Sequence, residues 1–106
     1  MCQKIDYAKL GIKIKELRLH RGYTQDSLAE AVGCNTSHIS NIENNHTKVS
    51  LNVLFGIANV LDTSIDYLLS NQYRNTKLAL DNELDRAIRK CSIEQKEKLL
   101  KIIEIL

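Results

Sequence analysis

Apolar residues recur along the chain with helical spacing, and no segment shows a convincing alternation of period two. The first helix is predicted to begin after Asp6, a suitable N-cap, and to run to His20, with Gly22 stopping it. Its inward stripe consists of Leu10, Ile14 and Leu17. The chain therefore opens with an amphipathic helix.

Two shorter helices follow. Thr24 is the predicted N-cap of the second helix, which ends at Gly33, and the third opens at Asn35. The inward residues of these two helices are expected to be Leu28, Ala29, Val32, Ile39 and Ile42. A polar run over 44–48 separates the third helix from the next apolar segment.

Ser50 is the predicted N-cap of a fourth helix, and either Thr63 or Ser64 caps a short fifth helix over 65–69. The inward positions of the fourth helix are expected to be Leu51, Leu54, Ile57, Ala58 and Leu61. Residues 70–77 are polar and lack an apolar stripe, which indicates a linker.

Beyond the linker, helical spacing resumes with Leu80, Leu84 and Ile88. Ser92 and Gln95 form a capping-box pattern that predicts a last helix over 93–106. We therefore expect a domain over 6–70, a linker over 71–80 and a helical segment over 81–106.

Length and composition narrow the protein classes. At 106 residues and 43% apolar content, the chain can build one domain and a small appendage. It has no Pro and four Gly, as expected of a mostly helical protein. The net charge of +2 argues against a histone-like condenser, and 5% aromatic residues with no Trp argue against a stacking platform for single strands.

Candidate chemistry other than binding is sparse. Three cysteines without a C-x-x-C pair indicate a reducing compartment, and no secretory signal or membrane-spanning run is seen, so we expect a cytoplasmic protein. Cys34 and His38 are four residues apart, but two ligands do not make a zinc site, and Cys34 is expected to fill a small apolar position. No nucleophile with a base, and no phosphate-binding glycine loop, is found. We expect no enzymatic activity, cofactor or metal.

The segment 24–43 carries the functional signal. A tight crossing of two helices requires a small residue, here Ala29, and a turn residue that tolerates positive φ, here Gly33. Burial of the third helix's apolar residues leaves a short, polar, uncharged face outward. That face consists of Thr36, Ser37, Ser40 and Asn41. Such a face suits hydrogen bonding to base edges in the major groove.

Several anchor residues at these spacings resemble one family. They are Ile14, Leu17 and Arg18; Thr24, Gln25, Leu28, Ala29, Val32 and Gly33; Ile39 to Glu43; Ser50 and Leu51; and Ile65 to Leu68. This set is similar to the lambda-repressor-like, Xre-type helix-turn-helix DNA-binding domain, over about residues 8–70. The resemblance implies an all-α protein, with a five-helix DNA-binding domain followed here by a two-helix C-terminal extension.

The resemblance also implies roles for individual residues. Gln25 matches the glutamine that holds a DNA phosphate and braces the recognition helix, whereas Arg18 and Glu43 match a structural salt bridge and are excluded from the site. The positions that read bases or flank them are Thr36, Ser37, His38, Ser40 and Asn41, and the loop positions near the sugar-phosphate backbone are Asn44, His46, Thr47 and Lys48.

This chain departs from the family pattern in its loop and its recognition helix. Asn45 replaces a common Gly, although Asn tolerates a left-handed conformation, and Val49 replaces a common Pro. The recognition helix lacks Arg and Gln, so we expect specificity to depend on Asn41, on methyl contacts from Thr36 and on DNA shape. Positive charge is concentrated in residues 1–23, whereas residues 24–69 are acidic, so phosphate contacts are expected to be modest and reinforced by helix amino termini.

The last helix has a surplus of apolar surface. Around Leu99, its apolar arc extends over roughly 220°, wider than one core requires. This width predicts two partners, the preceding helix and a second protomer; the alternative is that both faces fold back onto the N-terminal domain. The leading interpretation is a repressor that binds a palindromic double-stranded operator as a homodimer. The alternative is an antitoxin-type module whose C-terminal helices bind another protein and whose DNA binding is autoregulatory.

Overall fold

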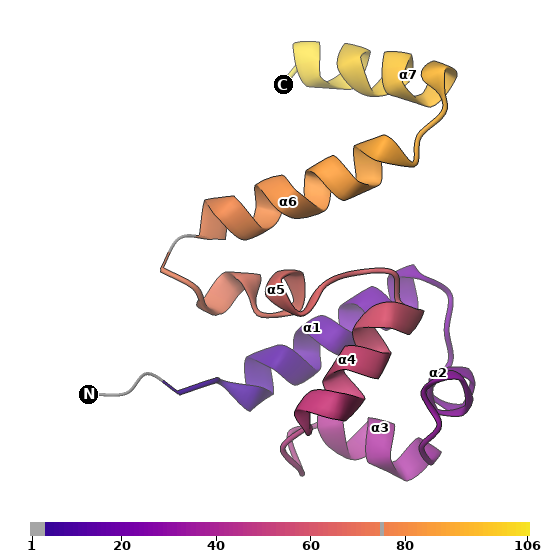
Figure 1. The fold of residues 1–106 in the computed structure, drawn as a ribbon, viewed down its shortest axis with the longest axis vertical. Helices are drawn as coiled ribbons and strands as arrows, with labels where there is room; N and C mark the ends of the chain where they lie inside the picture. Colours follow the sequence, from indigo (N-terminus) through magenta and orange to yellow (C-terminus); the bar gives the residue numbers. More distant parts are fainter. Residues whose placement is uncertain (1–3, 75) are drawn as a thin grey trace.

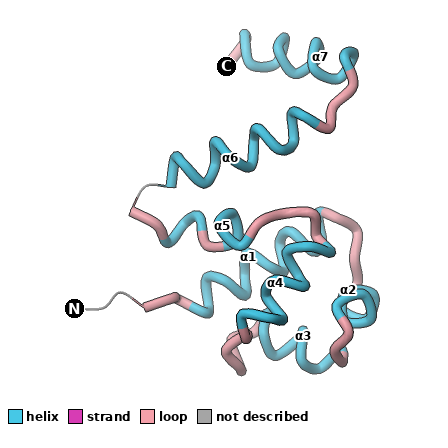
Figure 2. Tube along the Cα trace, in the orientation of Figure 1, coloured by secondary structure: helices cyan, strands magenta, loops and turns pink. Residues whose placement is uncertain are grey.

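The computed structural model describes residues 4–74 and 76–106, and it is all-helical over these ranges (Figures 1 and 2). The helices are α1 (Tyr7–His20), α2 (Gln25–Val32), α3 (Thr36–Glu43), α4 (Leu51–Val60), α5 (Ile65–Leu68), a 3-10 helix η1 (Ser70–Gln72), α6 (Thr76–Arg89) and α7 (Ile93–Glu104). The predicted fold class, five helices followed by a two-helix extension, is confirmed.

Side-chain caps define where the helices begin. Asp6 accepts a hydrogen bond from the Lys9 amide at 3.0 Å. The other N-caps act in the same way, and they are Thr24, Asn35, Ser50, Ser64 and Ser92. Each cap satisfies an amide that lacks a partner within its helix. The structure resolves the open choice at α5 in favour of Ser64.

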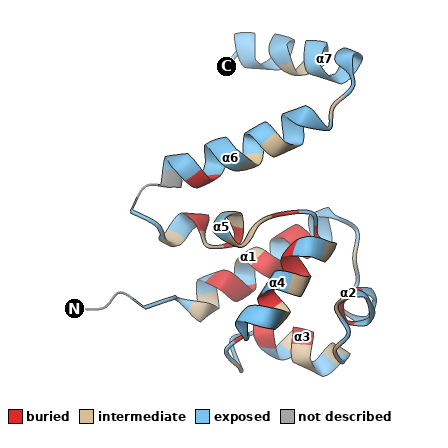
Figure 3. Ribbon diagram, in the orientation of Figure 1, coloured by how far each residue is buried: buried red, intermediate tan, exposed pale blue. Residues whose placement is uncertain are grey.

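The core is shared among α1 to α5 (Figure 3). Its fully buried side chains come from every one of these helices and from the turn after α4; they include Leu10, Ile14, Leu28, Ile39, Ile57, Leu61 and Leu68. The predicted stripes of α1 and α3 are all buried, and Val32 of α2 packs partly buried against the same cluster. Their burial at helical spacing fixes the five helices as one unit.

Gly11 brings α1 and α3 unusually close together. A Cβ atom at this position would lie 2.5 Å from the carbonyl oxygen of Ile42 and 2.9 Å from that of Glu43. Both oxygens belong to backbone at the end of α3, so neither can move aside as a flexible side chain could. This glycine therefore sets how closely α1 approaches α3.

One predicted core position is wrong. Leu51 was expected to face inward, but it is 71% exposed. It stands at the first position of α4, at the margin of the core, and Val49 from the preceding loop is buried with the core residues instead. The helical stripe of α4 therefore begins at Leu54.

The polar segment after α5 is more ordered than its composition indicates. The 3-10 helix η1 and the start of α6 at Thr76 occupy much of the expected linker. Gln72 donates its amide to the Asp6 carbonyl at 3.0 Å and accepts from the Asp6 amide at 2.7 Å. Because these are hydrogen bonds rather than apolar contacts, hydrophobic spacing did not reveal them. The division into domains stays a prediction.

In the extension, α6 lies beside α5 and η1, whereas α7 lies beyond α6, away from the five-helix unit (Figures 1 and 3). Ala79 is the buried hydrophobic residue of α6, and none of the residues of α7 is buried. The helix α7 ends at Glu104, two residues before the predicted end. The last helix therefore does not fold back onto the N-terminal domain, and the expected packing against the preceding helix does not bury any residue of α7. Over the described ranges, no helix is long and apolar enough to cross a membrane.

Replacing Gly11 with Ala is expected to destabilise the protein by about 1–3 kcal/mol, although Ala normally favours a helix, because the new Cβ overlaps backbone oxygens. The free energy of unfolding in urea measures this effect. Gly56→Ala is the matched control, since its Cβ would meet only the Val32 Cγ1 methyl at 3.2 Å. Equal stabilities for the two variants would contradict a backbone contact at Gly11.

Candidate nucleic-acid interface

The turn between α2 and α3 determines the direction of the candidate reading helix. Gly33 has φ +89°, a left-handed conformation that glycine adopts without a Cβ penalty. The amides of Gly33 and Cys34 both donate to the Ala29 carbonyl, at 2.9 and 3.0 Å. Asn35 then caps α3 by accepting from the His38 amide at 2.8 Å. This turn confirms the positive φ predicted for Gly33, and Ala29 is buried.

A buried ion pair holds α3 against α1. The Arg18 guanidinium donates to both carboxylate oxygens of Glu43, at 2.7 and 3.1 Å, and the two side chains are only 7% and 1% exposed. Arg18 also donates to the Tyr23 carbonyl at 2.9 Å. Gln25 donates to the same carboxylate at 3.0 Å, so α2 joins the network. The salt bridge implied by the family resemblance is confirmed.

The outward residues of α3 lie together on one face. Ser37 and Asn41 are exposed, and Thr36, His38 and Ser40 are half-buried. The buried residues of the helix, Ile39, Ile42 and Glu43, occupy its other side. The helix thus presents short polar side chains without a formal charge, a surface suited to base edges.

The loop after α3 continues this surface. Asn45 has φ +59°, so the asparagine adopts the left-handed conformation expected of it, and the His46 amide donates to the Asn41 carbonyl at 2.8 Å. Lys48 Nζ lies 5.7 Å from the centroid of the Tyr7 ring. The loop residues are Asn44, His46 and Lys48, which are exposed, and Thr47, which is half-buried. The structure therefore brings the predicted loop residues to the carboxyl end of α3.

Asp26 is a residue of this surface that sequence reasoning missed. The Thr36 hydroxyl donates to Asp26 Oδ1, so the first residue of α3 is tied to α2. Sequence spacing gives little indication of this contact, because an acidic residue such as Asp26 in the first turn of a helix is ordinarily explained by the helix dipole. Gln25, by contrast, is bonded to Glu43 rather than to the amino end of α3.

Two cations of the first 23 residues, Lys13 and Arg21, contact elements other than α3. Lys13 Nζ lies 4.4 Å from the centroid of the Tyr67 ring on α5, and Arg21 donates to the Leu61 carbonyl at 2.8 Å. Arg18 is neutralised by Glu43. Lys48 lies in the loop after α3, and the amino termini of α2 and α3 present backbone amides.

Cysteine and metal chemistry do not add to this site. Cys34 is half-buried against the core, as expected, and burial raises the pKa of its thiol. Cys2 lies outside the described residues. Within those residues, no group of three or more metal-ligating side chains comes together.

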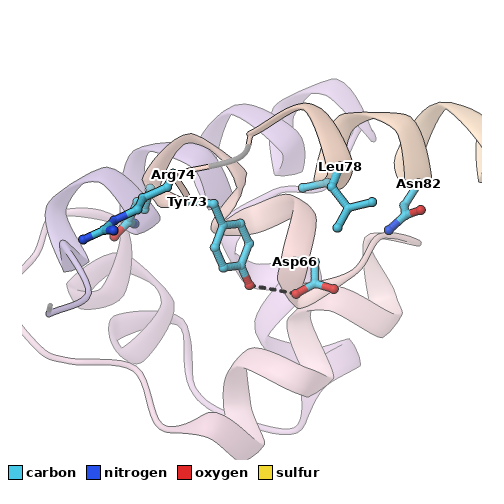
Figure 4. A pocket seen from close by; sticks show the side chains of 7 residues that line it. Asp66, Tyr73, Arg74, Leu78 and Asn82 are labelled. Atoms are coloured by element: carbon cyan, nitrogen blue, oxygen red, sulfur yellow. Dashed lines mark hydrogen bonds between the residues drawn. The ribbon is translucent and has the colours of Figure 1, made fainter. Parts of the chain in front are cut away.

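A cavity of about 420 Å³ lies elsewhere, between α5, η1 and α6 (Figure 4). The residues labelled there are Asp66, Tyr73, Arg74, Leu78 and Asn82. Tyr73 donates its hydroxyl to Asp66 at 2.8 Å, and this hydrogen bond is the main cause that raises the pKa of Tyr73. None of the predicted DNA-contact residues lines this cavity.

Comparison with known proteins finds similarity to helix-turn-helix proteins. Residues 14–68 match the helix-turn-helix family model. The chain is 34% identical over 82 residues to the HTH-type transcriptional regulator SinR of Bacillus subtilis (strain 168), covering 76% of this chain and 74% of SinR. It is 33% identical over 76 residues to the HTH-type transcriptional regulator ImmR of the same organism, covering 72% of this chain and 57% of ImmR.

Solved structures of regulatory proteins also resemble this chain in fold. The SinR protein/SinI protein complex aligns with a TM-score of 0.59 and 29% identity, covering 90% of this chain and 94% of that chain. The restriction-modification controller protein C.AhdI from Aeromonas hydrophila aligns with a TM-score of 0.55 and 31% identity, covering 57% of this chain and 92% of that chain.

Removing one partner of the buried pair is expected to be costly. Glu43→Ala leaves the Arg18 guanidinium buried without its counter-ion and is expected to lower the free energy of unfolding by about 3–5 kcal/mol. The double variant Arg18→Met, Glu43→Leu removes both charges and is expected to lose much less than the two single losses combined. Urea unfolding measures both. The exposed Glu30→Ala is the control, expected within about 0.5 kcal/mol of the wild type; a Glu43→Ala effect that small would refute the anchoring role.

Proposed function

Because this chain belongs to the lambda-repressor-like, Xre-type helix-turn-helix family, whose SinR and ImmR relatives are transcriptional regulators, we propose that it is a sequence-specific regulator of transcription, and specifically a repressor. It binds a palindromic operator in double-stranded DNA as a homodimer and acts in the cytoplasm, with no catalytic step. The observation that carries the proposal is the uncharged polar face of α3, which the buried Arg18–Glu43 pair holds outward.

The site residues divide into base and backbone contacts. Asn41 offers an amide that matches the N6 and N7 atoms of adenine, and Thr36 and Ser37 lie nearer the amino end of the helix. Gln25 contacts a phosphate from the start of α2 while it braces Glu43. The remaining proposed contacts flank the reading face or approach the sugar-phosphate backbone, and they are His38, Ser40, Asn44, His46, Thr47 and Lys48.

Asn41→Ala is expected to weaken operator binding by about 1–3 kcal/mol and to leave binding to random DNA unchanged, since it removes a base contact and no charge. The operator is first obtained by selecting bound sequences from a random DNA pool, and affinities are then measured by fluorescence anisotropy at fixed salt. Asn59→Ala, an equally exposed asparagine on α4, is the matched control. Equal losses on operator and random DNA would show that Asn41 does not read a base.

The homodimer is proposed to form through α6 and α7. Both helices and the C-cap of α7 display exposed large apolar side chains, and these are Leu78, Leu80, Leu84, Ile88, Ile93, Leu100, Ile102, Ile103 and Ile105. Such a surface on a water-exposed extension is typical of an assembly face. A dimer would place two α3 helices in major grooves about one helical turn apart.

Ile103→Lys is expected to convert the dimer to a monomer in sedimentation experiments, because it introduces a charge into the apolar surface of α7. Lys101→Ala, an exposed change on the same helix, is the control and should leave the assembly unchanged. A dimer that persists in Ile103→Lys at the same concentration would place the interface elsewhere.

A second candidate function is control through another protein, as in an antitoxin-type module. The similarity that favours it is to SinR in its complex with SinI, which extends over 90% of this chain and therefore reaches the extension. In this case α6 and α7 would bind a different protein, and DNA binding would be autoregulatory. Co-purification of the full chain from its own host distinguishes the two: a stoichiometric second protein that Ile103→Lys no longer retains favours this candidate over the homodimer.

A further inference from the structure

The hydroxyl hydrogens at the amino end of α3 are already engaged within the protein. Thr36 donates its hydroxyl to Asp26 Oδ1, and Ser37 donates its hydroxyl to Asn35 Oδ1 at 3.3 Å. A hydroxyl has one hydrogen, so each of these oxygens can offer only lone pairs to a further partner. The carboxylate of Asp26 also accepts and does not donate. We call the hydroxyl oxygens of Thr36 and Ser37 the acceptor rim.

The other end of the reading face has the opposite character. The Ser40 oxygen accepts from Asn44 Nδ2 at 3.3 Å, which leaves the Ser40 hydrogen available. Over residues 4–74 and 76–106, no hydrogen bond engages the side-chain amide of Asn41, which therefore offers both donors and an acceptor. The polarity of hydrogen bonding thus changes along α3, from acceptors alone at its amino end to donors and acceptors together toward its carboxyl end.

Each base presents a different pattern to such a rim in the major groove. Guanine offers two acceptors and thymine one, so both oppose a rim of acceptors. Adenine offers an amino donor beside its own N7 acceptor, whereas cytosine offers the N4 amino donor and no acceptor of its own. Cytosine is therefore the base that a surface made of acceptors alone favours most.

We propose that the acceptor rim selects cytosine in each half-site, and that Asp26 is the positioning residue that imposes this choice by holding the Thr36 hydroxyl. This inference rests on the proposed function and adds to it a base identity and a residue of α2. If Thr36 were free to rotate, its hydroxyl could donate to guanine or thymine or accept from cytosine or adenine, and would discriminate poorly.

The position of Asp26 favours a role in orienting the Thr36 hydroxyl. It is exposed at the start of α2, and its negative charge lies on the surface that is to approach phosphates. A carboxylate there weakens attraction to DNA in general. Gln25, its neighbour, is bonded to Glu43, so Asp26 is the residue of α2 that contacts the first residue of α3.

The test compares the DNA sequences selected from a random pool by the full-length wild type, Asp26→Ala, Thr36→Val and the double variant. The wild type is expected to prefer cytosine at one position of each half-site by roughly tenfold over the other bases. Asp26→Ala and Thr36→Val are each expected to reduce this preference to about twofold at that same position and to leave the others unchanged. In the double variant, Asp26→Ala should have no further effect, because Thr36 no longer has a hydroxyl to position.

Glu30→Ala is the matched control. It removes a second exposed negative charge from α2 and should strengthen binding to all DNA slightly while keeping the cytosine preference. A merely electrostatic or structural role for Asp26 would give the same result as Glu30→Ala.

The outcomes separate this inference from the function on which it rests. If the wild type enriches no sequence, both are overturned. If it enriches a sequence in which guanine or thymine stands at the position sensitive to Thr36→Val, the acceptor rim is refuted while the regulator remains. An unchanged preference in Asp26→Ala, or preferences lost at different positions in the two single variants, refutes the role of Asp26 alone.

Discussion

The arrangement of the candidate interface depends on the buried pair of Arg18 and Glu43. Each charge loses its hydration on burial, and such a loss is offset only when geometry and further hydrogen bonds are good. Here the guanidinium donates to both carboxylate oxygens. It also donates to the Tyr23 carbonyl, and the carboxylate accepts a further hydrogen bond from Gln25. An apolar pair could stabilise the core equally well, but it would not join α1, α2 and the end of α3 through directed bonds.

The pair works together with the close contact at Gly11. Directed hydrogen bonds fix the angle of α3, and the missing side chain at Gly11 allows α1 to approach its backbone. The amino end of α3 is held separately, by the turn at Gly33 and by the contact between Asp26 and Thr36. The helix α3 is thus held at both ends, and its position does not depend on contacts made by its polar face.

Most of the fold followed from local patterns in the sequence. Caps such as Asp6 and Ser92 act on amides three residues away, so sequence spacing reveals them directly. Leu51 was wrongly placed because periodicity describes the face of a helix and not where the core ends along its axis. The bonds of Gln72 to Asp6 and of Asp26 to Thr36 join segments whose approach depends on the tertiary fold, so no spacing rule could identify them. The resemblance supplied candidate positions for the site, but not which partner each side chain already has.

The extension is attached by different forces from those of the core. Thr63 donates to Glu83 at 3.2 Å, and Asp62 pairs with Lys90 and Arg86. The hydrogen bond from Lys90 is the main cause that lowers the pKa of Asp62. These exposed ion pairs are screened by salt and contribute little each, so they orient α6 more than they stabilise it. Most of the large apolar side chains of α7 are exposed, and a partner that covered them would supply more free energy than these ion pairs do.

The position of the positive charges bears on how the proposed reading face would distinguish bases. Lys13 and Arg21 are turned toward α5 and the end of α4, so these two cations do not add to the charge beside α3. Binding that is weak on any DNA depends more on the bases it reads, because the sequence-independent contribution is small. A neutral reading face cannot distinguish bases by charge, so its discrimination lies in which side chains donate and which accept. In the proposed role, Asp26 lowers general attraction to DNA while it orients Thr36, and both effects shift the balance from affinity toward specificity.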